Sequence, residues 1–255
     1  EGLEPVRKRP GMYIGSTDTI GLHHLVWEIV DNAVDEANEG YGKNIYVIIH
    51  DDNSLEVIDQ ARGIPYDYNE KEKLTGFQIV YQTLHGGGKF DEKNYSHAGG
   101  LHGVGAAVTN ALSKWMEIHS YKDGVDHFGR FENGGKKFSG IKDLGPTTKR
   151  GTSVRFLPDD TIFEDITWNY ERISSHLDHR ACLTKGVTFH LKDERSGRSQ
   201  TYFYERGLLE YYQRRTAGKT ALCQPVHIEG KSSEGISVET VFGFLKDNYD
   251  EMVYI

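Results

Sequence analysis

The clearest hydrophobic pattern in the chain lies between residues 21 and 38. Apolar side chains recur there at alternating gaps of three and one, which places them along one side of an α-helix. They are Leu22, Leu25, Val26, Ile29, Val30, Ala33, Val34 and Ala37. Gly40 follows shortly after and fits the end of a helix. The pattern therefore predicts an amphipathic helix over 21–38.

Three polar residues of this helix, His24, Glu28 and Asn32, are spaced four apart and stack along one flank beside the apolar stripe. Partial burial between apolar neighbours would raise the pKa of Glu28 and suit it to act as a general base, with His24 hydrogen-bonded to it. Asn32 offers a neutral oxygen to a hard cation such as Mg²⁺. An ordinary solvated helix face is the alternative. The other acidic residues are expected on the exposed side: Asp31, Asp35 and Glu36.

Two β-rich stretches, 43–50 and 55–59, flank the polar turn 51–54 and predict a β-hairpin. The second strand runs into Asp59, which is followed by the segment 60–65, Gln-Ala-Arg-Gly-Ile-Pro. Asp59 is either a turn cap or a single acceptor aimed into a pocket, where it would read an exocyclic amine.

Glycine is concentrated in one part of the chain, with seven of its 29 residues between positions 86 and 105. The segment 100–105 runs into a predicted helix over 106–112, whose unpaired N–H groups and dipole would favour phosphate. A hinge or lid loop is the alternative. A Walker A loop is excluded because Phe90 follows Gly88-Lys89, and no strand directly precedes the glycines, as a dinucleotide fingerprint requires.

The remaining pattern mixes strands and helices, which indicates an α+β protein with a largely antiparallel or mixed sheet. Strands are predicted over 115–121, 125–131, 151–157, 187–192 and 200–204, and helices over 74–84, 168–181 and 208–213. The basic segment 214–222 is a candidate linker, followed by further strands. We expect one domain over 1–206 and the start of a second over 207–255.

The charge, cysteine content and hydropathy of the chain exclude several classes of protein. The 255 residues carry a net charge of −8, which argues against a general nucleic-acid-binding surface on this segment. Two cysteines are too few for a disulfide scaffold or a structural zinc cluster. No apolar run is long enough to cross a membrane, and no signal peptide is visible, so a cytoplasmic location is expected. The chain opens at Glu1 and stops within an apolar stretch, as an excised fragment would.

Taken together, these segments resemble the ATP-binding domain of the B subunits of bacterial type IIA topoisomerases, DNA gyrase and topoisomerase IV. The resemblance covers nearly the whole chain, in the family's order, and is most specific in four segments: 6–15 (Val-Arg-Lys-Arg-Pro-Gly-Met-Tyr-Ile-Gly), 28–37 (Glu-Ile-Val-Asp-Asn-Ala-Val-Asp-Glu-Ala), 99–105 (Gly-Gly-Leu-His-Gly-Val-Gly) and 151–152 (Gly-Thr). It implies a two-layer α/β sandwich, the Bergerat or GHKL fold, followed by the start of an α+β transducer domain.

The resemblance also implies roles for matching residues. Glu28 would be the catalytic base that activates the attacking water, supported by His24, and Asn32 would coordinate Mg²⁺. Asp59 would accept a hydrogen bond from the adenine amino group, with Thr152 beside it through water. The rest of the ATP site is expected at the adenine slot and its mouth, Arg62, Gly63, Ile64 and Pro65, and around the phosphates, Lys89, Tyr95, Gly100, Leu101, His102, Gly103, Val104 and Gly105.

In the resembled family, ATP binding closes two B subunits into a dimer gate. The resemblance therefore implies homodimerisation on ATP binding, an A-subunit partner, DNA contacts through regions outside this chain, and ATP-competitive inhibitors at the adenine mouth. This chain lacks the family's N-terminal arm and its glutamine-threonine-lysine loop. We expect it to bind ATP, to turn it over slowly and to remain mostly monomeric.

Within the family, three features favour topoisomerase IV over gyrase: Trp27 and the segments 131–136 and 158–163. Three alternatives stay open. They are the gyrase counterpart, a nucleotide-binding switch without useful catalysis, and another superfamily member such as a kinase ATP domain. The absence of a visible phospho-acceptor histidine box makes the kinase less favoured.

Ala61 stands where the resembled family has a glycine, in Asp-x-Gly-x-Gly. Its β-carbon would crowd the base or strain a residue of positive φ, so we expect weakened nucleotide affinity in an intact fold. Ala61→Gly should therefore bind ATP more tightly than the parent chain in a direct titration. An unchanged affinity would refute this.

Overall fold

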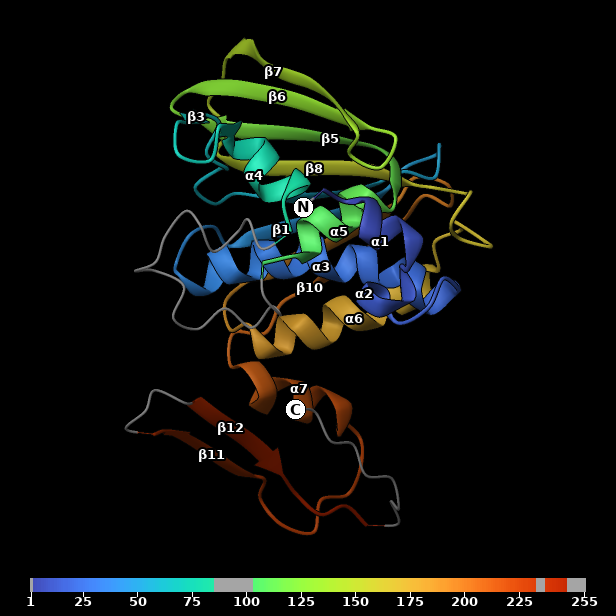
Figure 1. Ribbon diagram of the computed structural model, residues 1–255. Helices are drawn as coiled ribbons and strands as arrows, with labels where there is room; N and C mark the ends of the chain where they lie inside the picture. The colour runs from blue at the N-terminus through green and yellow to red at the C-terminus, as the bar shows by residue number, and fades with distance from the viewer. Residues whose placement is uncertain (1, 85–102, 233–236, 247–255) are drawn as a thin grey trace.

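An eight-stranded sheet runs through most of the molecule in the computed structural model, which describes residues 2–84, 103–232 and 237–246 (Figure 1). Its strand order is β10-β9-β1-β2-β8-β5-β6-β7. The strands are β1 (Asn44–Ile49), β2 (Leu55–Asp59), β5 (Ser113–Lys122), β6 (Val125–Glu132), β7 (Lys137–Pro146), β8 (Gly151–Pro158), β9 (Thr188–Asp193) and β10 (Arg198–Tyr202). The β1–β9 pair is parallel and the other pairs are antiparallel, so the sheet is mixed, as the sequence predicts.

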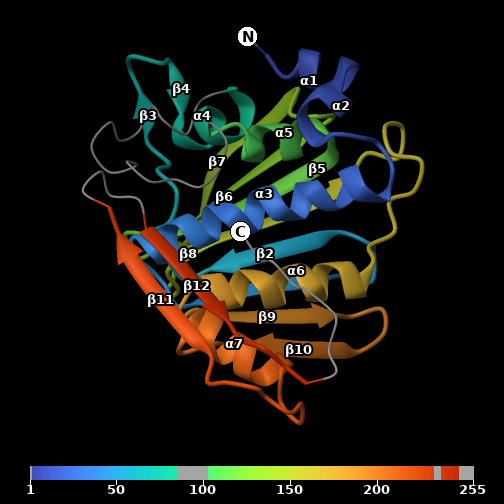
Figure 2. The same ribbon diagram turned by 90° about the horizontal axis from the view of Figure 1, so that it is seen from below.

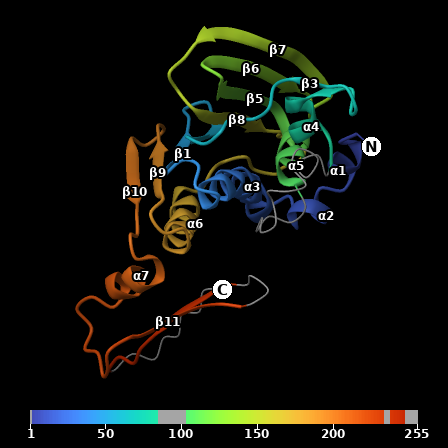
Figure 3. The same cartoon turned by 90° about the vertical axis from the view of Figure 1, so that its left-hand side faces the viewer.

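Helices gather on one side of this sheet and make the second layer (Figures 2 and 3). Figure 2 shows α3 and α6 side by side, running in much the same direction as β2 and β9. Together with the mixed sheet, this arrangement confirms the expected two-layer α+β fold. The helices are α1 (Glu4–Lys8), α2 (Gly11–Ile14), α3 (Thr19–Asn38), α4 (Gly76–Gln82), α5 (Gly105–Ala111), α6 (Tyr170–Leu183) and α7 (Gly207–Arg215).

Helix α3 is the predicted amphipathic helix. It begins two residues earlier than predicted because Asp18 caps it, its carboxylate accepting from the N–H groups of Ile20 and Gly21. Seven of the eight predicted apolar residues are buried, and Ala37 is partly buried. They pack in one core cluster with sheet residues such as Val57 and Phe156, so the apolar stripe orients the helix and leaves its polar flank beside α5 and α6.

The predicted β1–β2 hairpin is present, with Val47 opposite Val57. Burial alternates along β1, because successive side chains point to opposite faces of the sheet. Strand β7 was not predicted. Its residues are mostly exposed or partly exposed and include Gly140 and Gly145, so this edge strand shows little hydrophobic alternation. Two further short pairs lie outside the main sheet: β3 (Tyr68–Asn69) with β4 (Leu74–Thr75), and β11 (Val226–Lys231) with β12 (Ser237–Phe242).

Helix α7 connects the main fold to the β11–β12 hairpin. Its Tyr211 is buried and lies edge-on to Tyr204, within the same core cluster as the sheet and α3. The boundary expected at residue 206 stays a prediction, since the first turns of the second unit already share this core. None of the helices in the described parts of the chain combines the length and apolar character that a membrane crossing requires.

The burial of Phe156 leads to a testable prediction about the stability of the fold. Phe156 is fully buried and lies edge-on to Trp168, so Phe156→Ala should lower the free energy of unfolding by about 3–5 kcal/mol. Urea unfolding followed by circular dichroism measures the change. Phe203→Ala is the matched control, because Phe203 is 39% exposed and should cost far less. Equal losses in the two variants would contradict this description of the core.

Candidate functional site

Glu28 lies directly against the start of α5. A β-carbon placed on Gly105 would fall 1.8 Å from Glu28 Oε2 and 2.7 Å from its Cδ, so only glycine leaves room for the carboxylate. The packing of α3 on α5 therefore brings the end of the glycine-rich segment onto the predicted general base. The resemblance implies that both features belong to one site, and in the structure they lie in contact; their roles stay predictions.

The environment of Glu28 makes it a stronger base than an ordinary carboxylate. Burial raises its pKa, and the negative charge of Asp31 raises it further, while Arg180 acts in the opposite direction. This agrees with the prediction made from the apolar neighbours of Glu28. His24 is partly buried on the same flank, but no hydrogen bond between described residues joins it to Glu28. The supporting role of His24 stays a prediction.

Asp59 sits at the end of β2 and turns its carboxylate into the protein. Its Oδ1 accepts hydrogen bonds from the backbone N–H groups of Ala61, at 2.8 Å, and of Thr152, at 3.1 Å. Burial raises the pKa of Asp59 to about 6, although these two hydrogen bonds act to lower it. Asp59 is thus a turn cap, and it is also a desolvated acceptor of the kind that recognises an amine. Thr152 lies beside it through a direct backbone hydrogen bond, and the water-mediated role implied by the resemblance stays a prediction.

Two glycines permit the close packing around Asp59. Gly151 has φ +99°, and a β-carbon there would come within 2.2 Å of the Asp59 carbonyl oxygen. Gly63 has φ +75°, beside Ser120 and Lys122. Ile64 is held nearby because its carbonyl accepts from the Ser120 hydroxyl at 2.7 Å. Ile64 and Pro65 are only partly buried, which suits residues that wall a slot.

The structure changes one expectation about Ala61, the strain expected from a positive φ. Ala61 is not among the described non-glycine residues of positive φ, and it is 2% exposed. Of the two alternatives, backbone strain is therefore excluded, because strain was expected only for a residue of positive φ. The predicted effect of Ala61 on nucleotide affinity now depends on crowding alone and stays a prediction.

Arg62 is tied to α3. Its guanidinium donates to both carboxylate oxygens of Glu36, at 2.9 and 2.6 Å, and lies 4.3 Å over the Tyr41 ring. The expectation that Asp31 and Glu36 belong to the exposed side of the helix is wrong. Both are partly buried and held in ion pairs, Glu36 by Arg62 and Asp31 by Arg180. No local pattern indicates the partner of Asp31, because Arg180 lies 149 residues further along the chain.

The other predicted site residues are distributed as follows. Asn32 is exposed on α3, so its amide is open to a hydrated cation. Gly103 is exposed with φ +62°, and Val104 is partly buried immediately before α5. Five predicted phosphate-binding residues lie outside the described residues: Lys89, Tyr95, Gly100, Leu101 and His102.

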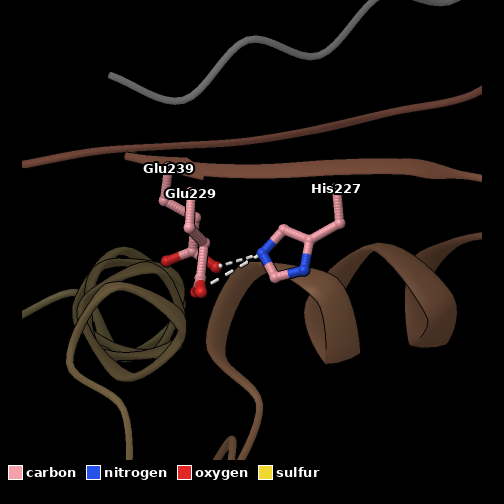
Figure 4. A group of neighbouring side chains, drawn as sticks. All are labelled: His227, Glu229 and Glu239. Carbon is pink, nitrogen blue, oxygen red and sulfur yellow. Dashed lines mark hydrogen bonds and ion pairs between the residues drawn. The ribbon is translucent and has the colours of Figure 1, made fainter. Parts of the chain in front are cut away.

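A second cluster of possible ligand residues lies on the β11–β12 hairpin, where His227, Glu229 and Glu239 converge (Figure 4). The two glutamates face each other directly across the hairpin. Lys185 pairs with both of them, and His227 Nε2 lies 2.9 Å from Glu239 Oε1. The ammonium already supplies the positive charge that a metal ion would bring. We therefore describe this group as an ion-pair cluster that joins the hairpin to the end of α6.

The structure thus combines a desolvated glutamate beside a helix start and a desolvated aspartate at a strand end with a two-layer fold of sheet and helices. The profile of the histidine kinase-, DNA gyrase B- and HSP90-like ATPase family matches residues 17–162, more than half of the chain. The chain belongs to this family.

Similarity to individual proteins is more specific. The chain is 50% identical to the B subunit of DNA topoisomerase 4 from Enterococcus faecalis and 46% identical to that from Bacillus subtilis, over 99% of its length. It spans 37% and 38% of those two proteins. Among solved structures it is similar to the 43K ATPase domain of Thermus thermophilus gyrase B in complex with an aminocoumarin. That match has TM-score 0.83 and 34% identity and covers 95% of this chain and 62% of that one.

The raised pKa of Asp59 predicts a pH-dependent stability. A carboxyl whose pKa is about 6 in the folded chain, against an ordinary 3.8, stabilises the fold below the ordinary value and loses that contribution as pH rises through about 6. Relative to Asp59→Asn, the free energy of unfolding of the parent should fall by roughly 3 kcal/mol as pH rises from below 3.8 to above 6. Urea unfolding of both proteins across this range measures it. A constant difference would contradict the assignment.

Proposed function

We propose that this chain binds ATP together with Mg²⁺ and forms the ATP-hydrolysing part of the B subunit of a bacterial type II DNA topoisomerase, topoisomerase IV. The observation that carries the proposal is the contact between Glu28 and Gly105, within a site that also holds the buried acceptor Asp59. The identities of 46–50% to topoisomerase 4 B subunits favour topoisomerase IV over gyrase, for which the similar structure is 34% identical.

In this proposal, each described residue has one task. Asp59 accepts a hydrogen bond from the adenine amino group, and its backbone donors from Ala61 and Thr152 hold the carboxylate in place. Ile64 and Pro65 flank the base, while Arg62 is oriented by Glu36 and Tyr41. The backbone from Gly103 to Gly105 approaches the phosphates, as does the segment before it.

Glu28 takes a proton from the water that attacks the terminal phosphate. Its desolvated position strengthens it as a base, and its contact with Gly105 keeps it close to the phosphate-binding segment. Asn32 is the residue that would hold Mg²⁺, because its exposed amide offers the oxygen ligand that this cation prefers. A bound Mg²⁺ would neutralise charge developing on the phosphates.

The proposal also covers the partners and the activity of the full-length protein. We infer that it acts in the cytoplasm with an A subunit, contacts DNA through regions outside this chain, and forms a homodimer on binding ATP. ATP-competitive inhibitors would occupy the adenine mouth near Arg62 and Pro65. The gyrase counterpart would show negative supercoiling instead of decatenation by the reconstituted enzyme. A nucleotide-binding switch would bind ATP without releasing phosphate.

Removal of the base tests the proposal. Glu28→Ala in the full-length protein should lower Mg²⁺-dependent phosphate release by about 10²- to 10⁴-fold, because the proposed acceptor of the proton from the attacking water is removed. Binding of a non-hydrolysable ATP analogue to the same variant should be retained. Glu39→Gln, which removes an exposed carboxylate at the end of the same helix, is the control and should hydrolyse ATP normally.

Unchanged hydrolysis in Glu28→Ala would refute the assignment of Glu28 as the base. Failure of the parent chain to bind the analogue would refute the proposed function as a whole.

A further inference from the structure

Two neighbouring strands hold the segment that walls the proposed base slot. Ser120 on β5 and His127 on β6 lie directly opposite each other in the sheet, and both are buried. The Ser120 hydroxyl donates to the carbonyl of Ile64 at 2.7 Å. The His127 ring stacks on the Tyr66 ring, with 3.6 Å between the ring centroids and 16° between the planes. The sheet therefore holds this segment at two residues, one on each side of Pro65.

A hydrogen bond fixes the plane of the His127 ring. Asp143 lies opposite His127 on the edge strand β7, and its Oδ1 is 2.6 Å from His127 Nδ1. Because an ionised carboxylate only accepts, Nδ1 is the nitrogen that donates. His127 is 3% exposed, whereas the side chain of Asp143 is 68% exposed. The ring beneath Tyr66 is thus oriented from the edge of the sheet and not by packing alone.

The second nitrogen of this ring indicates why a histidine stands here. His127 Nε2 is buried and has no hydrogen-bond partner among the described residues. A buried polar atom without a partner costs free energy, and a phenylalanine would stack on Tyr66 without that cost. What the histidine adds is the donor that Asp143 holds, so the ring serves as an oriented support.

Helix α4 supports the other end of the same segment. A β-carbon on Gly76 would fall 1.9 Å from the Pro65 carbonyl oxygen, and the Gly76 N–H donates to the carbonyl of Asp67 at 3.0 Å. The start of α4 is fixed in turn by the capping box of Thr75 and Gln78. Residues 64–67 are therefore supported from β5, from β6 and from the start of α4.

We propose that His127 is a positioning residue for recognition of the base. Its ring, held in plane by Asp143, supports Tyr66. Tyr66 in turn fixes Ile64 and Pro65 as the wall against which adenine packs. This inference rests on the proposed function, because it takes that wall as one side of the adenine slot.

The role differs from that of the groups that act on the phosphates. His127 is buried beneath Tyr66 and acts through the wall. A wall that is ordered before the nucleotide arrives spares the complex the entropy cost of ordering it on binding. Loss of the support should therefore weaken binding of the base and leave the chemical step unchanged.

Nucleotide binding to the 255-residue chain is the first test. His127→Ala should weaken binding of a non-hydrolysable ATP analogue by about 3- to 10-fold, the range expected for loss of one aromatic pair. ADP should lose the same factor, because both ligands carry the base. His127→Phe keeps a ring beneath Tyr66 and should recover most of the loss. Asp143→Ala should cost about 2-fold in the parent, and nothing further in His127→Phe, where the hydrogen bond is already absent.

A thermodynamic cycle identifies the stack as the cause. Tyr66→Ala removes the same ring contact from its other side and should give a loss similar to that of His127→Ala. The double variant should be no weaker than either single variant, since one contact is lost in all three. Additive losses would overturn the proposal. If His127→Ala does not fold, Tyr66→Ala and Asp143→Ala carry the same comparison.

His190→Ala is the matched control. His190 also stacks on a tyrosine, Tyr46, at 4.5 Å, and its ring nitrogens lie near Thr201 and Asn44, but it belongs to β9 near the opposite edge of the sheet. This variant should bind both nucleotides as the parent does, whatever it costs in urea unfolding. Unchanged affinity in folded His127→Ala, or a loss that His127→Phe does not recover, would overturn the proposal.

The second test is kinetic and uses the full-length protein. His127→Ala should raise KM for ATP by about 3- to 10-fold and keep kcat within about 2-fold of the parent, because interactions made equally in the ground and transition states are lost. A lowered kcat with an unchanged KM would overturn the role given to His127. A parent chain that binds neither nucleotide would instead defeat the proposed function.

Discussion

The site depends on one close contact, the approach of Glu28 to the backbone of Gly105. The space between them excludes even a methyl group, since a β-carbon on Gly105 would lie 1.8 Å from the carboxylate. This contact follows from the core, because the apolar stripe of α3 packs against the sheet and α5 packs against α3. The buried helix face therefore determines where the polar flank, and with it Glu28, must lie.

The packing of secondary-structure elements likewise determines the position of Asp59. Its strand lies at the centre of the sheet, between β1 and β8, so the carboxylate emerges where two strands and a turn meet. Backbone N–H groups of Ala61 and Thr152 satisfy it, and the left-handed Gly151 lets the strands approach. Burial outweighs the two hydrogen bonds and leaves a carboxylate that ionises reluctantly. Both acidic residues of the site are thus made unusual mainly by desolvation.

The features of the fold that could be predicted from the sequence were local. The period of residues 21–38 predicted α3 and its flank, and the strand-then-turn pattern located Asp59. The strain considered at Ala61 is absent because φ at a turn depends on the surrounding backbone, which no single residue reveals. Strand β7 was missed because an exposed edge strand has little apolar alternation to detect. Lys89 and Tyr95 lie outside the described residues, so their roles stay predictions.

The sequence by itself determined the helix, the hairpin and the position of the glycine cluster, and it supplied the candidate site residues. These follow from periodicity and turn chemistry, which act over a few residues. Only the tertiary structure decided which charges meet. Arg62 reaches Glu36 across 26 residues and Arg180 reaches Asp31 across 149. Such pairs depend on how helices pack on the sheet, and an isolated charged residue carries no sign of its distant partner.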